Sequence, residues 1–256
     1  MKAMVLAAGL GTRLRPLTDD RPKALVEING RTLLEITLSR LRGCGVSEVM
    51  INVHHLADMI VEYLKTNDNF GMRIEVSREE TLLDTGGGLK KAAHFFLGDS
   101  SRRSSHPDEP FIVHNVDVLS TIDLRRMMQC HNENQALATL AVQDRKTSRY
   151  LLFDDRLQLC GRWAGAAEPE FVRPALRPAQ QAHVLAFAGI HVIAPRLLPM
   201  MTEDGAFSII TSYLRLAAQG EKILAFRADE YYWRDLGRPE NVAQAAADLR
   251  QQAIAL

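Results

Sequence analysis

Blocks of apolar and polar residues alternate along the first half of the chain and predict strands and helices in turn. The apolar run Ala3–Ala8 predicts a buried strand, and the spacing of leucines across Thr32–Arg42 predicts a helix with one apolar face. The alternation continues to a predicted strand over Ala136–Val142. Between these blocks we expect strands over Glu48–Val53, Met72–Val76 and Phe111–His114, and helices over Leu56–Leu64, Gly88–Leu97 and Asp123–His131. Short links between alternating elements are typical of βαβ units, which build a parallel sheet with helices on both faces.

The second half of the chain follows a different pattern. Two short apolar runs around Asp154-Asp155 predict a hairpin, and His183–Ile193 predicts one long strand. The proline-bearing stretch Ala164–Gln181 predicts an irregular loop, as does the polar stretch Gly98–Pro110 in the first half. We also expect helices over Pro195–Met201, Ile209–Gln219 and Pro239–Gln252, and short strands over Lys222–Phe226 and Tyr231–Trp233. We therefore predict one α/β domain over residues 1–256, with a doubly wound half over 1–145 and a smaller lobe over 146–256.

Composition narrows the classes of protein that the chain can belong to. The 256 residues carry 31 basic and 31 acidic side chains, so no basic field favours nucleic acid or an anionic membrane as a partner. No stretch approaches the roughly 18 apolar residues of a membrane-spanning helix. The three cysteines, Cys44, Cys130 and Cys160, form no CxxC pair, which argues against a disulfide framework or a structural zinc site. We expect a cytoplasmic protein whose partners are small molecules.

A glycine-rich loop follows the first predicted strand. From Leu6 to Thr18 the chain reads Leu-Ala-Ala-Gly-Leu-Gly-Thr-Arg-Leu-Arg-Pro-Leu-Thr, and a Pro-Lys pair follows at Lys23. Glycines let backbone N–H groups approach an anion closely, while Arg13, Arg15 and Lys23 bring cations to the same place. The spacing matches neither GxGxxG nor the Gly-Lys-Ser/Thr of a Walker A loop. The loop therefore predicts phosphate binding outside the carboxyl end of the first strand.

This run and its downstream Pro-Lys resemble the signature of the sugar-phosphate nucleotidyltransferases, which join an NTP to a sugar 1-phosphate and release pyrophosphate. The resemblance extends over essentially the whole chain. It implies a Rossmann-like, doubly wound nucleotide-binding core with a mostly parallel mixed sheet and a small sugar-side extension. It also implies that Arg13 and Lys23 are catalytic and stabilise phosphate charge. The nucleotide-binding residues that it implies in this loop are Leu6, Ala8, Gly9, Gly11, Thr12 and Arg13.

A second glycine motif lies between Glu79 and Gly88, which reads Glu-Glu-Thr-Leu-Leu-Asp-Thr-Gly-Gly-Gly. Three glycines ahead of a predicted helix allow close backbone contact with a flat base or a phosphate. In the family a similar glycine turn closes on the nucleobase, so the resemblance implies that Glu79, Gly87 and Gly88 bind the nucleotide. The stretch Leu83–Gly88 most resembles the N-acetylmuramate-1-phosphate uridylyltransferases. A simple helix N-terminus capped by Thr85 is the structural alternative.

Two acidic residues complete the implied catalytic set. Asp117 ends an Asn-Val-Asp turn after a predicted strand, and Asp235 lies in a Trp-Arg-Asp-Leu-Gly-Arg-Pro-Glu segment that resembles a late motif of the family. Mg²⁺ prefers oxygen ligands and usually takes one or two carboxylates plus substrate phosphates. The resemblance implies that Asp117 and Asp235 hold one Mg²⁺, although each could instead be a turn former or a helix cap. Val116 stands where the family usually has glycine, which leaves the geometry of this turn open.

The acceptor side carries weaker signals. The segment Phe187-Ala188-Gly189-Ile190 resembles a family segment whose small residues face the sugar. We find no clear match between Ala164 and His183 to the Glu-Lys pair with which many related enzymes hold the sugar phosphate. The sugar-binding residues that the resemblance implies are Asn115, Ala188, Gly189 and Ser208.

We predict from these motifs a uridylyl transfer from UTP to N-acetylmuramate 1-phosphate. The alternatives are a guanylyltransferase that uses GTP with mannose 1-phosphate or a heptose 1-phosphate, and a non-catalytic nucleotide-sugar-binding protein. The motifs leave open whether the protein is a monomer or a dimer.

Overall fold

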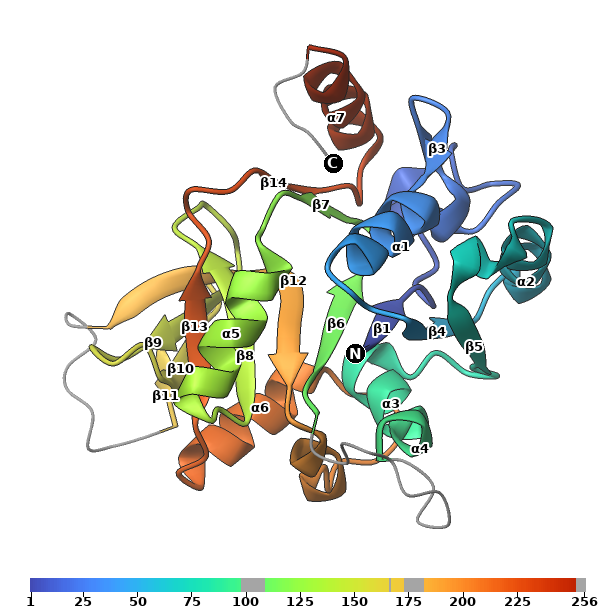
Figure 1. The fold of residues 1–256 in the computed structure, drawn as a ribbon. Helices are drawn as coiled ribbons and strands as arrows, with labels where there is room; N and C mark the ends of the chain where they lie inside the picture. Colours follow the sequence, from blue (N-terminus) through green and yellow to red (C-terminus); the bar gives the residue numbers. More distant parts are fainter. Residues whose placement is uncertain (98–108, 166, 173–181, 252–256) are drawn as a thin grey trace.

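A computed structural model describes residues 1–97, 109–165, 167–172 and 182–251 (Figure 1). Most of the two predicted loops, at 98–108, 166 and 173–181, lies outside the described residues, as does the end of the predicted closing helix. The main sheet has the strand order β11-β10-β9-β12-β6-β1-β4-β5, with β8 paired to β12 and β13 paired to β8. Its strands are β1 (Lys2–Leu6), β4 (Glu48–Val53), β5 (Arg73–Arg78), β6 (Phe111–Asn115), β8 (Ala138–Gln143), β9 (Tyr150–Phe153), β10 (Leu159–Trp163), β11 (Glu170–Phe171), β12 (His183–Ile193) and β13 (Ile223–Arg227).

The first half of the chain forms the parallel part of this sheet. Strand β1 pairs in parallel with both β4 and β6, and β4 pairs in parallel with β5. The side chains of β1 alternate between two apolar cores, with Ala3 and Val5 in one and Met4 and Leu6 in the other. A strand that buries both of its faces needs helices on both sides of the sheet. The predicted α/β fold is therefore confirmed.

Helices fill both layers. The first core receives apolar residues from α1, α2, α5 and α7, and the second receives them from α3, α4, α6 and the 3₁₀ helix η5. The helices are α1 (Leu33–Gly43), α2 (Ala57–Thr66), α3 (Asp84–Lys91), α4 (Ala93–Leu97), α5 (Leu124–Asn134), α6 (Ile209–Ala218) and α7 (Pro239–Arg250), with 3₁₀ helices η1 (Thr12–Leu14), η2 (Lys23–Leu25), η3 (Asp68–Gly71) and η5 (Pro195–Met200). Local sequence explains several starts: Thr32 and Asp123 cap α1 and α5 through their side chains, and Pro239 opens α7. No described helix is long and apolar enough to cross a bilayer.

The second half adds antiparallel pairing around one strand. Strand β12 runs antiparallel to β6, β8 and β9, and the β9–β10–β11 strands continue the sheet as antiparallel neighbours. The β12–β8 register shifts between Phe187 and His191, where Gly189 adopts a left-handed φ of 74°. Such a shift bends a strand and redirects its side chains. The sheet is thus mixed, as predicted, with its parallel order concentrated in β6-β1-β4-β5 and β8-β13.

Two short ladders lie outside the main sheet. Strands β2 (Glu27–Ile28) and β3 (Arg31–Thr32) form a small hairpin, and β7 (Val118–Ser120) pairs antiparallel with β14 (Trp233–Asp235). In Figure 1, β7 and β14 lie side by side above the ends of β6 and β12. The predicted bounds of the strand over Tyr231–Trp233 are wrong, because residues 233–235 are the ones that pair with β7, a strand that the sequence did not predict.

The predicted start of a helix at Gly88 is also wrong, because α3 begins at Asp84 and contains all three glycines. The N–H groups of Gly86 and Gly87 both point to the carbonyl oxygen of Phe207. An ideal Cβ on Gly86 would collide with the Phe207 ring, and one on Gly87 would collide with the Gly205 carbonyl oxygen. The glycines therefore let α3 approach the segment before α6, a contact that helix propensity alone does not foresee.

Candidate active site

The loop after β1 is shaped for close backbone approach. Gly11 has a left-handed φ of 67° and precedes η1, while the Thr18 hydroxyl donates a 2.9 Å hydrogen bond to its carbonyl oxygen. Within the described residues, no acceptor is found for the backbone N–H of Gly9 or Leu10, and both residues are exposed. Free N–H groups in a glycine turn are typical of anion sites. Among the other loop residues that the resemblance singled out, Leu6 and Ala8 are buried, and Thr12 and Arg13 are exposed.

Lys23 reaches into this loop from η2. Its Nζ donates a 2.8 Å hydrogen bond to Oδ2 of Asp117, and both side chains are only 14% exposed. The same Nζ lies 3.3 Å from an ideal Cβ position on Gly9, so a side chain there would crowd the lysine. The structure thus brings together the glycine loop, a lysine from the Pro-Lys pair and the first of the two predicted aspartates.

The second aspartate arrives through the β7–β14 ladder. Asp235 lies opposite Val118, and the Leu236 N–H donates a 2.8 Å hydrogen bond to the Asp117 carbonyl oxygen. Two aspartates more than a hundred residues apart in the sequence therefore lie on neighbouring, hydrogen-bonded backbone segments. An ideal Cβ on Gly237 would lie 2.7 Å from Nη2 of Arg13 and 2.8 Å from Oδ1 of Asp235, so this guanidinium also comes close.

We call this group of residues the glycine-loop edge: the Gly9–Arg13 loop, Lys23, Asp117 and Asp235. Its parts are tied together by the backbone, because the Val116 N–H donates a 3.1 Å hydrogen bond to the Leu6 carbonyl oxygen.

Val116 fits its turn without strain. Its φ is not among the positive values found in the described residues, and its side chain is 1% exposed within the first core. A turn that needs no left-handed backbone does not require glycine. The open question about this position is thereby answered for the local geometry.

The glycine-loop edge has the donor set of a Mg²⁺ site that is completed by substrate. The described residues contain no group of three or more His, Cys, Asp or Glu side chains that could hold a metal ion by themselves. Asp117 and Asp235 are both partly exposed carboxylates, and each keeps one oxygen that makes no hydrogen bond to a described residue. One or two carboxylates with phosphate oxygens are the usual ligands of catalytic Mg²⁺. The two residues fit this ion.

Glu79 is engaged within the protein. It is 4% exposed, its Oε1 accepts a 2.7 Å hydrogen bond from the Asn52 amide, and its Oε2 accepts a 3.0 Å hydrogen bond from the Leu83 N–H. Asn52 in turn accepts a 2.8 Å hydrogen bond from the Ala7 N–H with its Oδ1. Our sequence reasoning missed Asn52, although a single polar residue in an otherwise apolar strand was a usable signal. The contact of Glu79 with a nucleobase stays a prediction.

Gly88 belongs to the same network. An ideal Cβ there would lie 2.7 Å from both the Asn52 amide nitrogen and Oε1 of Glu79. Glycine at this position therefore permits the buried hydrogen bond between Asn52 and Glu79, and Gly87 faces the Gly205 carbonyl instead.

On the acceptor side, the structure places Asn115 and Gly189 in contact. An ideal Cβ on Gly189 would lie 2.8 Å from the Asn115 amide nitrogen and 3.0 Å from a methyl group of Val118. The Ala188 carbonyl oxygen accepts a 2.7 Å hydrogen bond from the Trp233 indole. Ser208 caps the start of α6, where its hydroxyl accepts a 3.4 Å hydrogen bond from the Ile210 N–H, and within the described residues it makes no hydrogen bond to Asn115 or Gly189.

Arg145 completes this surface and was not foreseen from the sequence. Its guanidinium lies over the Trp233 ring, with Cζ 3.6 Å from the ring centroid, and Nη2 donates a 2.8 Å hydrogen bond to the Phe187 carbonyl oxygen. We call Arg145, Phe187–Gly189 and Trp233 the β12 wall.

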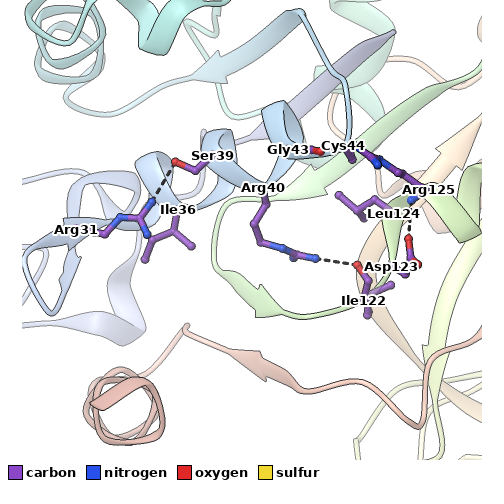
Figure 2. A pocket seen from close by; sticks show the side chains of 10 residues that line it. All are labelled: Arg31, Ile36, Ser39, Arg40, Gly43, Cys44, Ile122, Asp123, Leu124 and Arg125. Atoms are coloured by element: carbon purple, nitrogen blue, oxygen red, sulfur yellow. Dashed lines mark hydrogen bonds between the residues drawn. The ribbon is translucent and has the colours of Figure 1, made fainter. Parts of the chain in front are cut away.

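A cavity of about 400 Å³ lies elsewhere, between α1 and the start of α5 (Figure 2). None of the predicted site residues lines it. Arg40 points toward the segment before α5 and donates hydrogen bonds to the Ser120 hydroxyl (2.9 Å) and the Ile122 carbonyl oxygen (2.8 Å). Burial lowers the pKa of this guanidinium to about 10. Since Ser120 ends β7, Arg40 stabilises the β7–β14 ladder that carries Asp235. The cavity contains none of the predicted site residues and is not the candidate active site.

Known proteins resemble this chain over most of its length. A family model described as "Nucleotidyl transferase" matches residues 2–153, which is more than half of the chain. The chain is also 35% identical over 255 residues to the N-acetylmuramate alpha-1-phosphate uridylyltransferase of Caulobacter vibrioides, across 97% of this chain and 96% of that protein. The chain belongs to the nucleotidyl transferase family. The resemblance to sugar-phosphate nucleotidyltransferases is therefore confirmed, and the chain is a nucleotidyltransferase rather than a non-catalytic binding protein.

One further relative and one solved structure are similar to this nucleotidyltransferase over nearly all of its length. The mannose-1-phosphate guanylyltransferase of Mycobacterium tuberculosis is 28% identical over 96% of this chain, which spans only 64% of that protein's length. A solved UDP-glucose pyrophosphorylase, crystallised with UDP-glucose, superposes with a TM-score of 0.76 at 18% identity and covers 98% of both chains. At this identity the second likeness shows the fold alone, and it agrees with the mixed sheet described above.

Proposed function

We propose that this nucleotidyltransferase joins UTP to N-acetylmuramate 1-phosphate and forms UDP-N-acetylmuramate and pyrophosphate. The reaction class is supported by one observation: the backbone around Asp235 is hydrogen-bonded to the backbone around Asp117, beside Lys23 and Arg13. The choice of substrates is supported by the Caulobacter vibrioides relative, whose similarity covers nearly the full length of both chains.

The chemistry is a direct in-line transfer. An oxygen of the sugar 1-phosphate forms a bond to the α-phosphorus of UTP, and the bond between that phosphorus and the bridging oxygen of the β-phosphate breaks. Pyrophosphate leaves with the electron pair. Because the nucleophile is already an anion, no general base is required, and the protein contributes positioning and charge neutralisation.

The residues of the glycine-loop edge divide this work. The free N–H groups of Gly9 and Leu10 would bind oxygens of the triphosphate, and the Arg13 guanidinium would neutralise charge on the transferring phosphate. Lys23, which is hydrogen-bonded to Asp117, would turn its ammonium toward the leaving pyrophosphate.

Asp117 and Asp235 would hold Mg²⁺. When bound, the ion supplies positive charge that stabilises the phosphoryl oxygens and orients them for displacement. Residues 1–145 would then bind the nucleotide, and 146–256 would supply most of the acceptor site.

A matrix of substrates tests the proposal. The purified protein is mixed with Mg²⁺, each of UTP, GTP, dTTP and CTP, and each of N-acetylmuramate, glucose, mannose and heptose 1-phosphates, and pyrophosphate release is measured. We expect the highest kcat/KM for UTP with N-acetylmuramate 1-phosphate. A clear preference for another pair would falsify the substrate assignment and leave the reaction class intact.

The second candidate is a guanylyl transfer from GTP to mannose 1-phosphate. It is favoured by the Mycobacterium tuberculosis relative, which matches 96% of this chain at 28% identity. In the same matrix it predicts that GTP with mannose 1-phosphate is the best pair.

A further inference from the structure

The β12 wall holds a cation whose hydrogen bonding is incomplete. Nε of Arg145 is buried and has no hydrogen-bond partner, and Nη2 is bonded only to the Phe187 carbonyl oxygen. Within the described residues, no carboxylate forms an ion pair with this guanidinium. Buried N–H groups without an acceptor are rare in native proteins and invite an explanation. A bound anion would supply the missing charge and accept hydrogen bonds from the other N–H groups of the guanidinium.

The guanidinium is held in a defined plane. The Trp233 ring stacks against one face at 3.6 Å, and the Trp233 indole is itself fixed by its 2.7 Å hydrogen bond to the Ala188 carbonyl oxygen. Arg145 and Trp233 thus use consecutive carbonyl groups of β12, immediately before Gly189. A planar, stacked guanidinium presents its remaining N–H groups as a fork that matches two oxygens of a phosphate.

The guanidinium of Arg145 lies within electrostatic range of Asp235. Trp233 and Asp235 are two residues apart on β14, so their side chains share a face of that strand. Burial lowers the pKa of Arg145, and the Asp235 carboxylate opposes that shift, which places the two charges within electrostatic range. An anion bound by Arg145 would therefore lie on the side of Asp235, whose backbone neighbour Leu236 is hydrogen-bonded to Asp117.

We propose that Arg145 binds the phosphate group of the sugar 1-phosphate and aims its oxygen at the α-phosphorus, with Trp233 holding the guanidinium plane. This proposal rests on the proposed function, because it assigns an acceptor-phosphate site within that reaction. It fills the place for which the sequence offers no Glu-Lys pair between Ala164 and His183.

Steady-state kinetics of Arg145→Gln, Arg145→Lys and a control test the proposal. The control is Arg196→Gln, which removes an arginine that is 50% exposed and whose ion-pair partner is Glu221 on the surface. With UTP and N-acetylmuramate 1-phosphate as substrates, we expect R145Q to raise the KM of the sugar phosphate roughly ten- to hundredfold. The KM of UTP should stay within about twofold of wild type, R145K should recover part of the loss, and R196Q should behave as wild type.

Several outcomes would overturn the proposal. An active, folded R145Q whose sugar-phosphate KM is unchanged contradicts it, as does an equal rise in KM for both substrates. If R145Q does not fold, the test uses R145K, which keeps the positive charge but lacks the paired N–H groups of the guanidinium. A sugar-phosphate KM equal to that of wild type in R145K would exclude phosphate binding by the guanidinium. If wild type prefers another substrate pair, the same comparison is made with that pair. A wild type that releases no pyrophosphate with any pair overturns the proposed function and this site together.

Discussion

In the glycine-loop edge, Lys23 and Asp117 neutralise each other across 2.8 Å, whereas in the β12 wall Arg145 lies on Trp233 without an ion-pair partner in the described part of the chain. The first region combines one continuous stretch, Gly9–Lys23, with two distant aspartates, and its lysine is paired with Asp117. The second region is also assembled from three distant segments, and its guanidinium has no carboxylate partner within the described residues. Both regions therefore contain segments that are recognisable in the sequence, whereas the cation Arg145 is revealed only by its contacts in the structure.

The difference has an energetic basis. A partly buried ion pair loses little when ligand is absent, because each charge already has a partner. A guanidinium stacked on an indole gains cation–π attraction and packing, which offsets part of the loss of hydration. We therefore expect substitutions in the glycine-loop edge to act on turnover and those in the β12 wall to act on acceptor affinity.

The largest expected effect is on turnover. Asp117→Asn and Asp235→Asn should each lower kcat about 100-fold or more, because each removes a charge that the transition state needs while keeping the shape of the side chain. Pyrophosphate release at saturating substrates measures this, with thermal melting to verify folding. Asp155→Asn, on an exposed hairpin turn, is the control and should retain wild-type kcat. Near-normal turnover in both variants would break the assignment of these residues.

The next effect concerns three buried histidines. His114 on β6 and His191 on β12 are 1% exposed, and burial lowers the pKa of each to about 3, while burial lowers that of His131 to about 4. These folded-state values lie below the ordinary 6.5, so the unfolded chain binds more protons and stability falls as pH drops from about 6.5 toward 4. Each histidine should destabilise the protein by on the order of 1–2 kcal/mol at pH 5 relative to pH 7.

Urea unfolding at pH 7, 6 and 5 measures this dependence. Burial raises the pKa of Glu203, but its hydrogen bonds with Arg215, the backbone and Ser212, together with the charge of Arg215, lower that pKa to about 2, so this carboxylate should not titrate in this window. Replacing His191 by Gln should flatten the slope between pH 7 and 5. A slope that stays unchanged in the variant contradicts the assignment of the histidine.

An effect smaller than the sum over the three histidines separates packing from nucleotide binding in α3. Gly87→Ala should destabilise the fold by about 2–3 kcal/mol, because a Cβ there would meet the Gly205 carbonyl oxygen. Gly43→Ala is the matched control, since nothing lies within 4 Å of an ideal Cβ on that helical glycine. It should be neutral or slightly stabilising. Chemical denaturation measures both. If G87A has the stability of wild type and a raised KM for UTP, the result would contradict the packing role and support nucleotide binding by this glycine.

The smallest effect tests whether Ser208 serves the helix or the sugar. Ser208→Ala removes the hydroxyl that caps α6 and should cost about 1 kcal/mol of stability. The KM of the sugar phosphate should not change, because the Ser208 hydroxyl bonds to the start of α6 and, in the described part of the chain, not to the β12 wall. Ser208→Asp, which restores a cap, should recover the stability. A rise in that KM at constant stability would support the sugar contact that the family resemblance implies.

Local order along the chain was determined by the sequence itself. The alternation of apolar blocks predicted β1, β4, α1 and β12 within a residue or two, because a strand or helix that must bury a face needs a matching period. The glycine loop and its Pro-Lys were recognisable for a similar reason, since backbone approach to phosphate imposes residue types on consecutive positions.

Only the tertiary structure decided which distant residues meet. The β7–β14 ladder selects residues 233–235 as a strand and brings Asp235 beside Asp117, and no local preference encodes that register. Gly86 and Gly87 of α3 are needed because the segment before α6 packs closely against them. The role proposed for Arg145 depends on the Trp233 ring and the Phe187 carbonyl oxygen, which lie far away in the sequence. Local patterns record the period and the turn chemistry of each segment, whereas contacts between segments depend on packing that the chain adopts as a whole.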